Sequence, residues 1–322
     1  MIAIQVKETG GAETLEMVDQ AEPEIQPSHL VVAVAAAGVN FIDTYQRGGL
    51  YPMEMPFVLG MEGAGRVVEV GDGVGDVSVG DVVAWADVQG SYAQYALIPR
   101  DRAVIVPGDV APETAAAAML QGLTAHYLAT STFPLEAGHR CLIHAGAGGV
   151  GRLLIQIAKR IGAEVFTTVG SDEKAQVASA AGPDHVINYR QRPFSEAVEE
   201  IAGTRPLDVV YDGVGASTFE DGLGLLKRRG MMVSFGNASG AVPPISPLVL
   251  SRNGSLYLTR PTLGHYIGER PELEARAADL FQWIEESSLD VLVGNRYPLN
   301  DAAQAHQDLE GRATTGKSLL IP

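Results

Sequence analysis

A glycine-rich stretch near the middle of the chain has the residue types and spacing to hold a dinucleotide. It reads G-x-G-x-x-G from Gly146 to Gly151, directly after the apolar run CLIH at 141–144. Residues 152–162 then place apolar side chains on one helical face and end in Gly162, which suits a helix C-cap. We therefore expect a strand, a tight turn at Gly146, an open approach for a pyrophosphate at Gly148, and close helix packing at Gly151. A purely structural turn is the alternative.

About twenty residues further on, the sequence lacks the carboxylate that usually holds the ribose hydroxyls of NAD. The place reads Thr-Val-Gly-Ser at 168–171, followed by Asp172, Glu173 and Lys174. Gly170 leaves room for a 2′-phosphate, Ser171 offers a donor, and Lys174 offers a cation. We expect Asp172 to cap the next helix and point to solvent. The pattern predicts NADPH rather than NADH.

Two sequence patterns, one in each part of the chain, indicate which elements position these residues. The first 110 or so residues carry short alternating runs such as IAIQV and GDVVAWA, separated by turn signals. This spacing is typical of an all-β, barrel-like unit. After Pro112, helical stretches alternate with β-rich runs such as EVFTTVG and LDVVYDGVG. This alternation of strands and helices predicts an α/β fold with a doubly wound parallel sheet. From about Leu263 a helix, a strand and a short helix end the chain.

The composition restricts the classes of protein to consider. The chain has 322 residues, enough for about two domains, and a formal net charge of −16. So much acid argues against binding to nucleic acid or to an anionic membrane surface. Cys141 is the only cysteine, which rules out an intrachain disulfide and a cysteine-rich zinc site. No signal-peptide pattern and no 18-residue apolar run is present, so we expect a cytosolic protein with no membrane segment.

The order of these parts resembles the medium-chain dehydrogenase/reductase superfamily. The run GHRCLIHAGAGGVGRLLIQIAK (138–159) is similar to the signature of its NADPH:quinone oxidoreductase and ζ-crystallin branch. Further segments, among them GVNFIDTYQRGGLYP, QGLTAHYL, RRGMMVSFGNASGAV and RATTGKSLLIP, resemble the bacterial quinone reductases from end to end. The resemblance implies a GroES-like β-barrel catalytic domain at 1–122 and 264–322. It also implies a Rossmann domain that binds NADPH at 123–263.

The resemblance also implies chemistry without a metal. Zinc-dependent relatives hold their catalytic metal with a cysteine near the start of the chain and a His-Glu pair. The corresponding positions here carry Asn40, Met61 and Glu62. An amide and a thioether cannot make a tight zinc site, and one cysteine cannot supply the four thiolates of a structural zinc. We therefore expect no bound metal.

The resemblance further implies where the cofactor lies. Its nicotinamide end is expected against the Asn40 to Asp43 turn and near Tyr127, and its phosphates and adenosine on the glycine loop and the next strand end. The residues implied to bind it are Phe41, Ile42, Asp43, Thr124, Tyr127, Gly146, Gly148, Gly149, Val150, Gly151, Gly170, Ser171, Asp172, Glu173, Lys174, Tyr189, Val214, Gly236, Asn237, Ala238, Ser239, Pro261, Thr262, Leu263 and Arg312.

Without a metal to polarise an oxygen, the acceptor must already be electrophilic, as quinones are. The protein then has to stack the acceptor on the nicotinamide and donate hydrogen bonds to the developing anion. Candidate donors are Asn40, Tyr45 and Tyr51, with Arg260 as a cation at a strand end. Tyr45 and Tyr51 belong to TYQRGGLYP, which we interpret as a loop at a pocket rim, although rings that simply cover the barrel are the alternative. No residue is a clear general acid, and a semiquinone product is allowed.

Three functions follow from these observations. The first is NADPH-dependent quinone reduction. The second is NADPH-dependent reduction of activated C=C bonds in enones or enals. The third is an NADPH-binding structural or regulatory protein of the crystallin type.

Residues 255–261, SLYLTRP, form a β-rich run at the last position of the predicted sheet. An uncovered edge strand there can pair with another chain. We expect a homodimer through this edge, as the resemblance implies.

Overall fold

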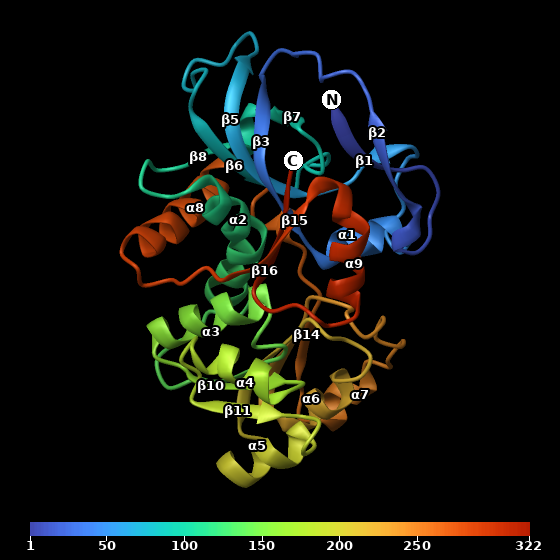
Figure 1. Ribbon diagram of the computed structural model, residues 1–322. Helices are drawn as coiled ribbons and strands as arrows, with labels where there is room; N and C mark the ends of the chain where they lie inside the picture. The colour runs from blue at the N-terminus through green and yellow to red at the C-terminus, as the bar shows by residue number, and fades with distance from the viewer. The chain divides into compact units, whose positions relative to one another are not determined.

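The computed structural model describes all residues, 1–322, and divides into two units. The first unit comprises residues 1–123 and 266–322, and the second comprises residues 124–265. The chain thus leaves the first unit once and returns to it at its C-terminal end (Figure 1). The domain boundaries predicted from the sequence, after 122 and 263, remain predictions.

The first unit is mainly β-structure with helices at its connections. Its elements are β1 (Ile2–Val6), β2 (Leu15–Asp19), β3 (His29–Val39), α1 (Phe41–Arg47), β4 (Phe57–Val58), β5 (Glu62–Val70), β6 (Val82–Ala86), β7 (Tyr95–Pro99), β8 (Val104–Ile105), α2 (Pro112–Tyr127, whose end belongs to the second unit), α8 (Arg270–Glu285), β15 (Val293–Pro298), α9 (Ala302–Glu310) and β16 (Lys317–Ile321).

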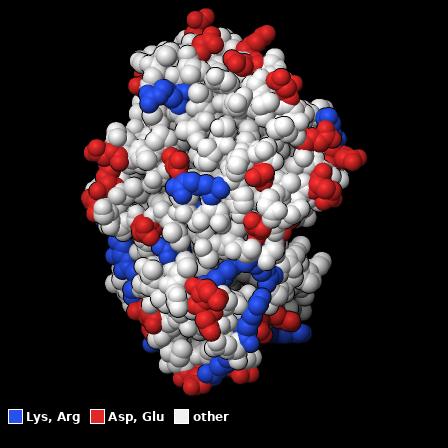
Figure 2. Space-filling model, viewed as in Figure 1, with Lys and Arg blue, Asp and Glu red and all other residues white.

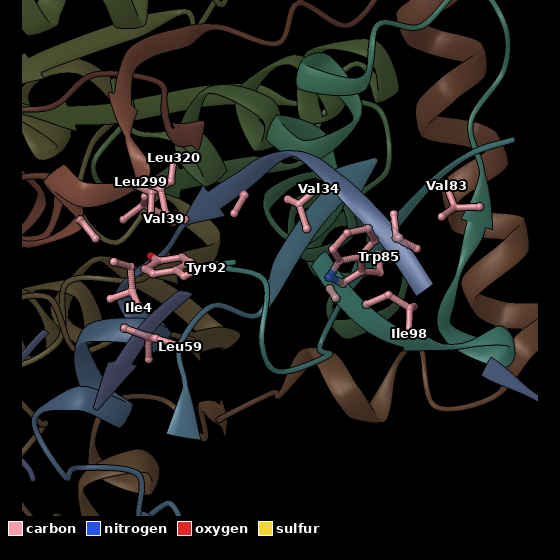
Figure 3. Packing of buried hydrophobic residues seen from close by; sticks show 14 of the residues in the cluster. Ile4, Val34, Val39, Leu59, Val83, Trp85, Tyr92, Ile98, Leu299 and Leu320 are labelled. Atoms are coloured by element: carbon pink, nitrogen blue, oxygen red, sulfur yellow. The ribbon is translucent and has the colours of Figure 1, made fainter. Parts of the chain in front are cut away.

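Two sheets build this unit. A three-stranded antiparallel sheet has the order β2-β1-β4, and a seven-stranded sheet has the order β15-β16-β3-β5-β6-β8, with β7 also paired to β3. The C-terminal strand β16 pairs antiparallel with β3, so residues from the two ends of the chain share one sheet. Figure 3 shows the core, where Trp85 and Tyr92 lie among aliphatic side chains that include Leu299 and Leu320 from the returning segment.

The second unit alternates strands and helices. Its elements are β9 (Arg140–Ile143), α3 (Gly149–Ile161), β10 (Glu164–Val169), α4 (Asp172–Ser179), β11 (His185–Asn188), α5 (Phe194–Ala202), β12 (Leu207–Asp212), α6 (Phe219–Leu225), β13 (Leu226–Ser234), α7 (Leu248–Arg252) and β14 (Tyr257–Thr259). The six strands are all parallel, in the order β11-β10-β9-β12-β13-β14. The predicted doubly wound sheet is confirmed, with its change of direction at β9 and β12.

Local sequence explains the elements around the glycine loop. The apolar run before the loop forms β9, a central strand that is buried on both faces, as central parallel strands are. The apolar stripe of 152–162 forms most of α3 and packs on the sheet. Gly162 adopts the left-handed conformation, with φ of 96°, and its N–H reaches the Ala158 carbonyl. The predicted strand, turn and helix are confirmed here.

Three elements differ from the sequence expectation. Residues Phe41–Arg47, expected as part of a turn and a loop, form helix α1, so Tyr45 projects from a helix. Strand β2 was not predicted at all. The expected edge strand at 255–261 is shorter, because only Tyr257–Thr259 pair with β13.

Charge is distributed unevenly between the two units. The first unit carries 27 Asp and Glu against 10 Lys and Arg, whereas the second carries 12 against 13. On the face in Figure 2, most of the basic side chains accordingly lie over the second unit. The net charge of −16 therefore belongs to the first unit, and the unit with the glycine loop is nearly neutral.

No helix in the structure has the length and apolar character needed to cross a bilayer. The cytosolic location remains a prediction.

Candidate functional site

The glycine loop of the second unit is packed on one side and open on the other. A Cβ at Gly146 would lie 2.1 Å from Thr167 Oγ1, and a Cβ at Gly151 would lie 2.3 Å from the Ala145 carbonyl oxygen. At Gly148, the N-cap of α3, a Cβ would lie 3.3 Å from the Ala145 carbonyl oxygen, which is a tight contact but a looser one than at the other two glycines. Gly146 and Gly151 are therefore required by packing, whereas Gly148 presents bare backbone at the start of α3. A pyrophosphate fits such a cradle.

The end of β10 has the features expected for a 2′-phosphate. Ser171 is the N-cap of α4, and its hydroxyl accepts a hydrogen bond from the Lys174 N–H at 3.2 Å. A Cβ at Gly170 would lie 2.5 Å from the Tyr189 hydroxyl oxygen, so Tyr189 lies directly over this glycine. Tyr189 is 39% exposed. The structure therefore brings Gly170, Ser171 and Tyr189 together, with the backbone of Lys174 next to Ser171.

The expectation that Asp172 caps α4 is wrong, because Ser171 is the N-cap, but Asp172 is exposed as expected. Its carboxylate accepts hydrogen bonds from Asn188 Nδ2 and Gln191 Nε2, each at 2.8 Å. The end of β11 and the turn after it therefore hold this carboxylate. Both donors are neutral amides, so the carboxylate keeps its charge beside Ser171.

The loops after β12 and β13 lie against each other. The Asp212 carboxylate, fully buried, accepts the Val214 N–H at 2.7 Å and the Gly215 N–H at 3.0 Å. Ser239 donates to the Val214 carbonyl through both its N–H and its hydroxyl, each at 2.8 Å. Two predicted cofactor segments, at Val214 and at 236–239, are thus joined at the carboxyl end of the sheet, where such folds bind ligands.

Arg260 is tied to the same loops. Its Nη1 donates to the Gly236 carbonyl at 3.0 Å and to the Ser234 hydroxyl at 3.3 Å. These bonds give the exposed Arg260 a role in holding the loop after β13. A direct role toward an acceptor remains a prediction, as do the roles of the following residues, 261–263.

The first unit contains a fully buried ion pair beside Asn40. Lys317 Nζ lies 2.5 Å from Glu62 Oε2 and 2.7 Å from Asn40 Oδ1, and these three side chains are at most 4% exposed. Glu62 Oε1 accepts the Leu120 N–H of α2 at 2.6 Å. A Cβ at Gly38 would lie 2.2 Å from Glu62 Oε2, so only glycine leaves room for this pair. The cluster joins β3, β5, β16 and α2.

The Asn40 side chain uses both of its amide hydrogens within this cluster. Nδ2 donates to Glu62 Oε2 at 2.9 Å and to the Gly38 carbonyl at 3.2 Å. As a donor to a substrate, Asn40 has to release one of these bonds, and the bond to Gly38 is the longer. The catalytic role of Asn40 remains a prediction with this condition attached.

A chain of hydrogen bonds runs from Asp43, at the start of α1, through Tyr92 and His306 to Arg47, and all four residues are buried. Asp43 Oδ2 accepts the Asn40 backbone N–H at 2.8 Å and the Tyr92 hydroxyl at 2.9 Å. Arg47 donates to His306 Nδ1 at 2.9 Å, and His306 Nε2 then lies 3.2 Å from the Tyr92 oxygen. Because Arg47 can only donate, His306 carries its proton on Nε2 and donates to Tyr92. Every bond in the chain therefore points toward Asp43.

Burial sets the charge state of this chain. It raises the pKa of Asp43 to about 7, although the Asn40 and Tyr92 hydrogen bonds and the Lys317 charge lower it. Burial, together with the Arg47 charge, lowers the pKa of His306 to about 3. His306 is thus neutral under ordinary conditions, while the carboxyl of Asp43 is poised between its two forms near neutral pH.

The remaining predicted side chains lie in several settings. The ring centroid of Tyr45, on α1, lies 6.1 Å from that of Phe41 and 5.5 Å from that of Tyr51. Tyr51 is 38% exposed, which suits a rim position. Tyr127 and Thr124, at the end of α2, are buried. Arg312 follows α9 and is exposed. Their roles in binding remain predictions.

The sequence reasoning missed Lys317, Tyr92 and His306. Lys317 carried a signal, because a lysine at the start of an apolar strand, KSLLI, is buried only if it has a partner. Its partner, Glu62, is 255 residues away, and no local pattern reveals that pairing. No group of three or more His, Cys, Asp or Glu side chains is arranged to hold a metal ion. The place expected for a metal in zinc-dependent relatives has an ammonium group against Glu62 and Asn40.

A nucleotide-binding parallel sheet and a β-rich unit with a returning C-terminal segment define the class of the medium-chain dehydrogenases and reductases. Two family models match the chain: the alcohol dehydrogenase GroES-like domain at residues 26–108, and zinc-binding dehydrogenase at residues 149–283. The GroES-like and Rossmann expectations are confirmed.

Individual relatives match over nearly the whole chain. Quinone oxidoreductase 1 of Escherichia coli is 45% identical over 99% of both chains. A solved structure of Escherichia coli quinone oxidoreductase complexed with NADPH has a TM-score of 0.98 at 44% identity and covers 100% of both chains. A 2-haloacrylate reductase of Burkholderia is 38% identical over 100% of this chain and 99% of its own. The chain belongs to the quinone oxidoreductase family of the medium-chain dehydrogenase/reductase superfamily.

The contrast between Gly148 and Gly151 gives a first prediction. Gly148→Ala should lower the unfolding temperature less than Gly151→Ala, since its Cβ would meet the Ala145 carbonyl oxygen at 3.3 Å rather than at 2.3 Å. It should weaken NADPH binding on the order of tenfold or more, because the methyl group would stand between the backbone and the pyrophosphate. Gly151→Ala should lower both the unfolding temperature and the affinity. Thermal unfolding and NADPH fluorescence titration measure the two effects, and wild-type affinity in Gly148→Ala would contradict this site.

Proposed function

We propose that this protein is an NADPH-dependent quinone reductase. The observation that carries the proposal is its similarity, over nearly its full length, to a quinone oxidoreductase whose structure was solved with NADPH. The open backbone at Gly148 and the group at Gly170, Ser171, Lys174 and Tyr189 support the choice of cofactor. When bound, NADPH supplies a hydride equivalent.

The chain's own residues would bind and orient the reactants. The start of α3 would hold the pyrophosphate, and Ser171 and Lys174 the 2′-phosphate. Asn40 and the two tyrosines, Tyr45 and Tyr51, are the proposed donors to the acceptor oxygen. The aromatic cluster of Phe41, Tyr45 and Tyr51 would offer an apolar surface to a flat ring. No group in the first unit is proposed as a dedicated acid.

A second acceptor class has its own support. The relative named 2-haloacrylate reductase suggests activated C=C bonds, which accept hydride without a metal in the same way as quinones. The charge of the first unit favours neutral acceptors over anionic ones such as a haloacrylate. Its 27 acidic side chains against 10 basic ones repel a carboxylate substrate. We therefore propose neutral acceptors, with quinones first and neutral enones second.

An acceptor panel tests this order. We expect NADPH oxidation, followed by its absorbance, to be fast with neutral quinones, slower with neutral enones, and slowest with a haloacrylate anion at low ionic strength. Added salt should reduce the penalty on the anion, since it screens the acidic unit. Tight NADPH binding without turnover on any acceptor would instead favour the structural or regulatory function.

The cofactor choice gives a separate prediction. Lys174→Ala should raise KM for NADPH on the order of tenfold and leave KM for NADH nearly unchanged, because only NADPH carries the 2′-phosphate. Steady-state kinetics with both cofactors measures the effect. Lys159→Ala is a matched control. Lys159 lies near the C-terminal end of α3, away from the glycine loop, and pairs with Asp184. Equal efficiency of NADH and NADPH in the wild type would defeat the assignment.

We also propose a homodimer through β14. Tyr257 and Leu258 are 57% and 38% exposed on the last strand of the sheet, where a second copy could pair. Light scattering after size exclusion should give twice 34.0 kDa, and the double variant Tyr257→Lys, Leu258→Glu should give the monomer mass. A wild-type protein of monomer mass at micromolar concentration would reject the dimer.

A further inference from the structure

Lys317 is a buried cation that the proposed reaction does not yet use. Its side chain is 1% exposed, and its ammonium donates to Glu62 Oε2 at 2.5 Å and to Asn40 Oδ1 at 2.7 Å. A buried ion pair stabilises a fold only weakly and is often replaceable by apolar side chains. Stability alone therefore does not explain this ion pair, which lies next to a candidate catalytic amide, that of Asn40.

The cluster determines the orientation of the Asn40 amide. Oδ1 faces the ammonium, and Nδ2 faces the Glu62 carboxylate and the Gly38 carbonyl. If the amide were turned over, its N–H groups would face the ammonium and its oxygen would face the carboxylate. Both contacts would then be repulsive inside a region that excludes water. The ion pair therefore fixes which end of Asn40 is the donor.

We propose that Lys317 is a positioning residue for the reduction, because its ammonium holds Asn40 with Nδ2 as the end that can donate to the acceptor oxygen. One Nδ2 hydrogen stays on Glu62 at 2.9 Å, and the hydrogen on the longer bond to Gly38, at 3.2 Å, is the one released to the substrate. This inference rests on the proposed function, since it needs an oxygen that becomes negative as the acceptor takes up hydride.

The same contacts would also serve a purely structural purpose, in which Lys317 only neutralises Glu62. Two variants separate these roles. Lys317→Met leaves the Glu62 carboxylate buried without its cation, which should lower the unfolding temperature strongly. The double variant Lys317→Met, Glu62→Gln removes both charges and should recover much of that loss. It should not restore the orientation of Asn40, because the amide introduced by Glu62→Gln can donate as well as accept.

Three measurements are made on the wild type and both variants. In steady-state kinetics with a quinone, we expect kcat of the double variant to stay reduced on the order of a hundredfold, the usual effect of losing one oxyanion donor. The affinity for NADPH by fluorescence should remain within about twofold. The kinetic isotope effect with NADPH deuterated at the transferred position should increase, since hydride transfer becomes slower. Arg270→Met, which removes a cation on α8 of the same unit, controls for general destabilisation.

A readout without turnover keeps the two hypotheses distinct. In protein labelled with ¹⁵N-asparagine, the side-chain NH₂ of Asn40, assigned with Asn40→Asp, should exchange slowly with water in the wild type and faster in the double variant. If the double variant regains wild-type kcat together with its stability, or keeps slow exchange, Lys317 has only a structural role. If the wild type reduces no quinone, the proposed function fails, while the exchange experiment still decides whether Lys317 orients Asn40.

Discussion

A buried ion pair between Lys317 and Glu62 constrains the first unit, because neither charge can be lost alone without leaving the other unpaired. Each charge has lost its water, and the hydrogen bonds around the pair offset part of this cost. The ammonium has Glu62 and Asn40, and the second oxygen of Glu62 has the Leu120 N–H. The contacts join the last strand of the chain to β3, β5 and α2. Breaking one partner would leave the other charge buried and unpaired, so the C-terminal return is tied to the pair as well as to the apolar core.

The second unit positions its groups by a different means, with backbone contacts rather than charge pairs. Gly146 and Gly151 allow the loop to press against β10 and the start of α3, and the Asp212 carboxylate fixes the turn after β12. Such contacts are short and local and leave little freedom to the loops. These contacts hold the loop around Gly148 and the turn after β12. A binding surface of this kind loses little conformational entropy when a ligand binds.

The sequence was informative where physical patterns are local. The strand, glycine turn and helix from β9 to α3 follow from apolar periodicity and from glycines that only this geometry requires. Helix α1 was missed because Phe41–Arg47 is rich in β-branched and aromatic residues, which have low helix propensity. Its best signal was Asp43, three residues after the N-cap Asn40, whose N–H it accepts. The Lys317 cluster was beyond prediction, since its partners come from opposite ends of the chain and meet only in the folded sheet.

The internal cation also bears on which acceptors this protein can reduce. A free positive charge beside a carbonyl would polarise it and activate weak electrophiles. Here the ammonium of Lys317 is largely neutralised by Glu62 at 2.5 Å, so little of its field remains for a substrate oxygen. In the proposed role of Asn40, the group offered to the acceptor is an oriented amide rather than a charge. An amide can stabilise an anion that is already delocalised, as in a reduced quinone, more readily than it can create an alkoxide from an ordinary ketone. The geometry of Asn40 and the strong acidity of the unit around it therefore favour the same class of acceptor, one that is neutral and electrophilic before it binds.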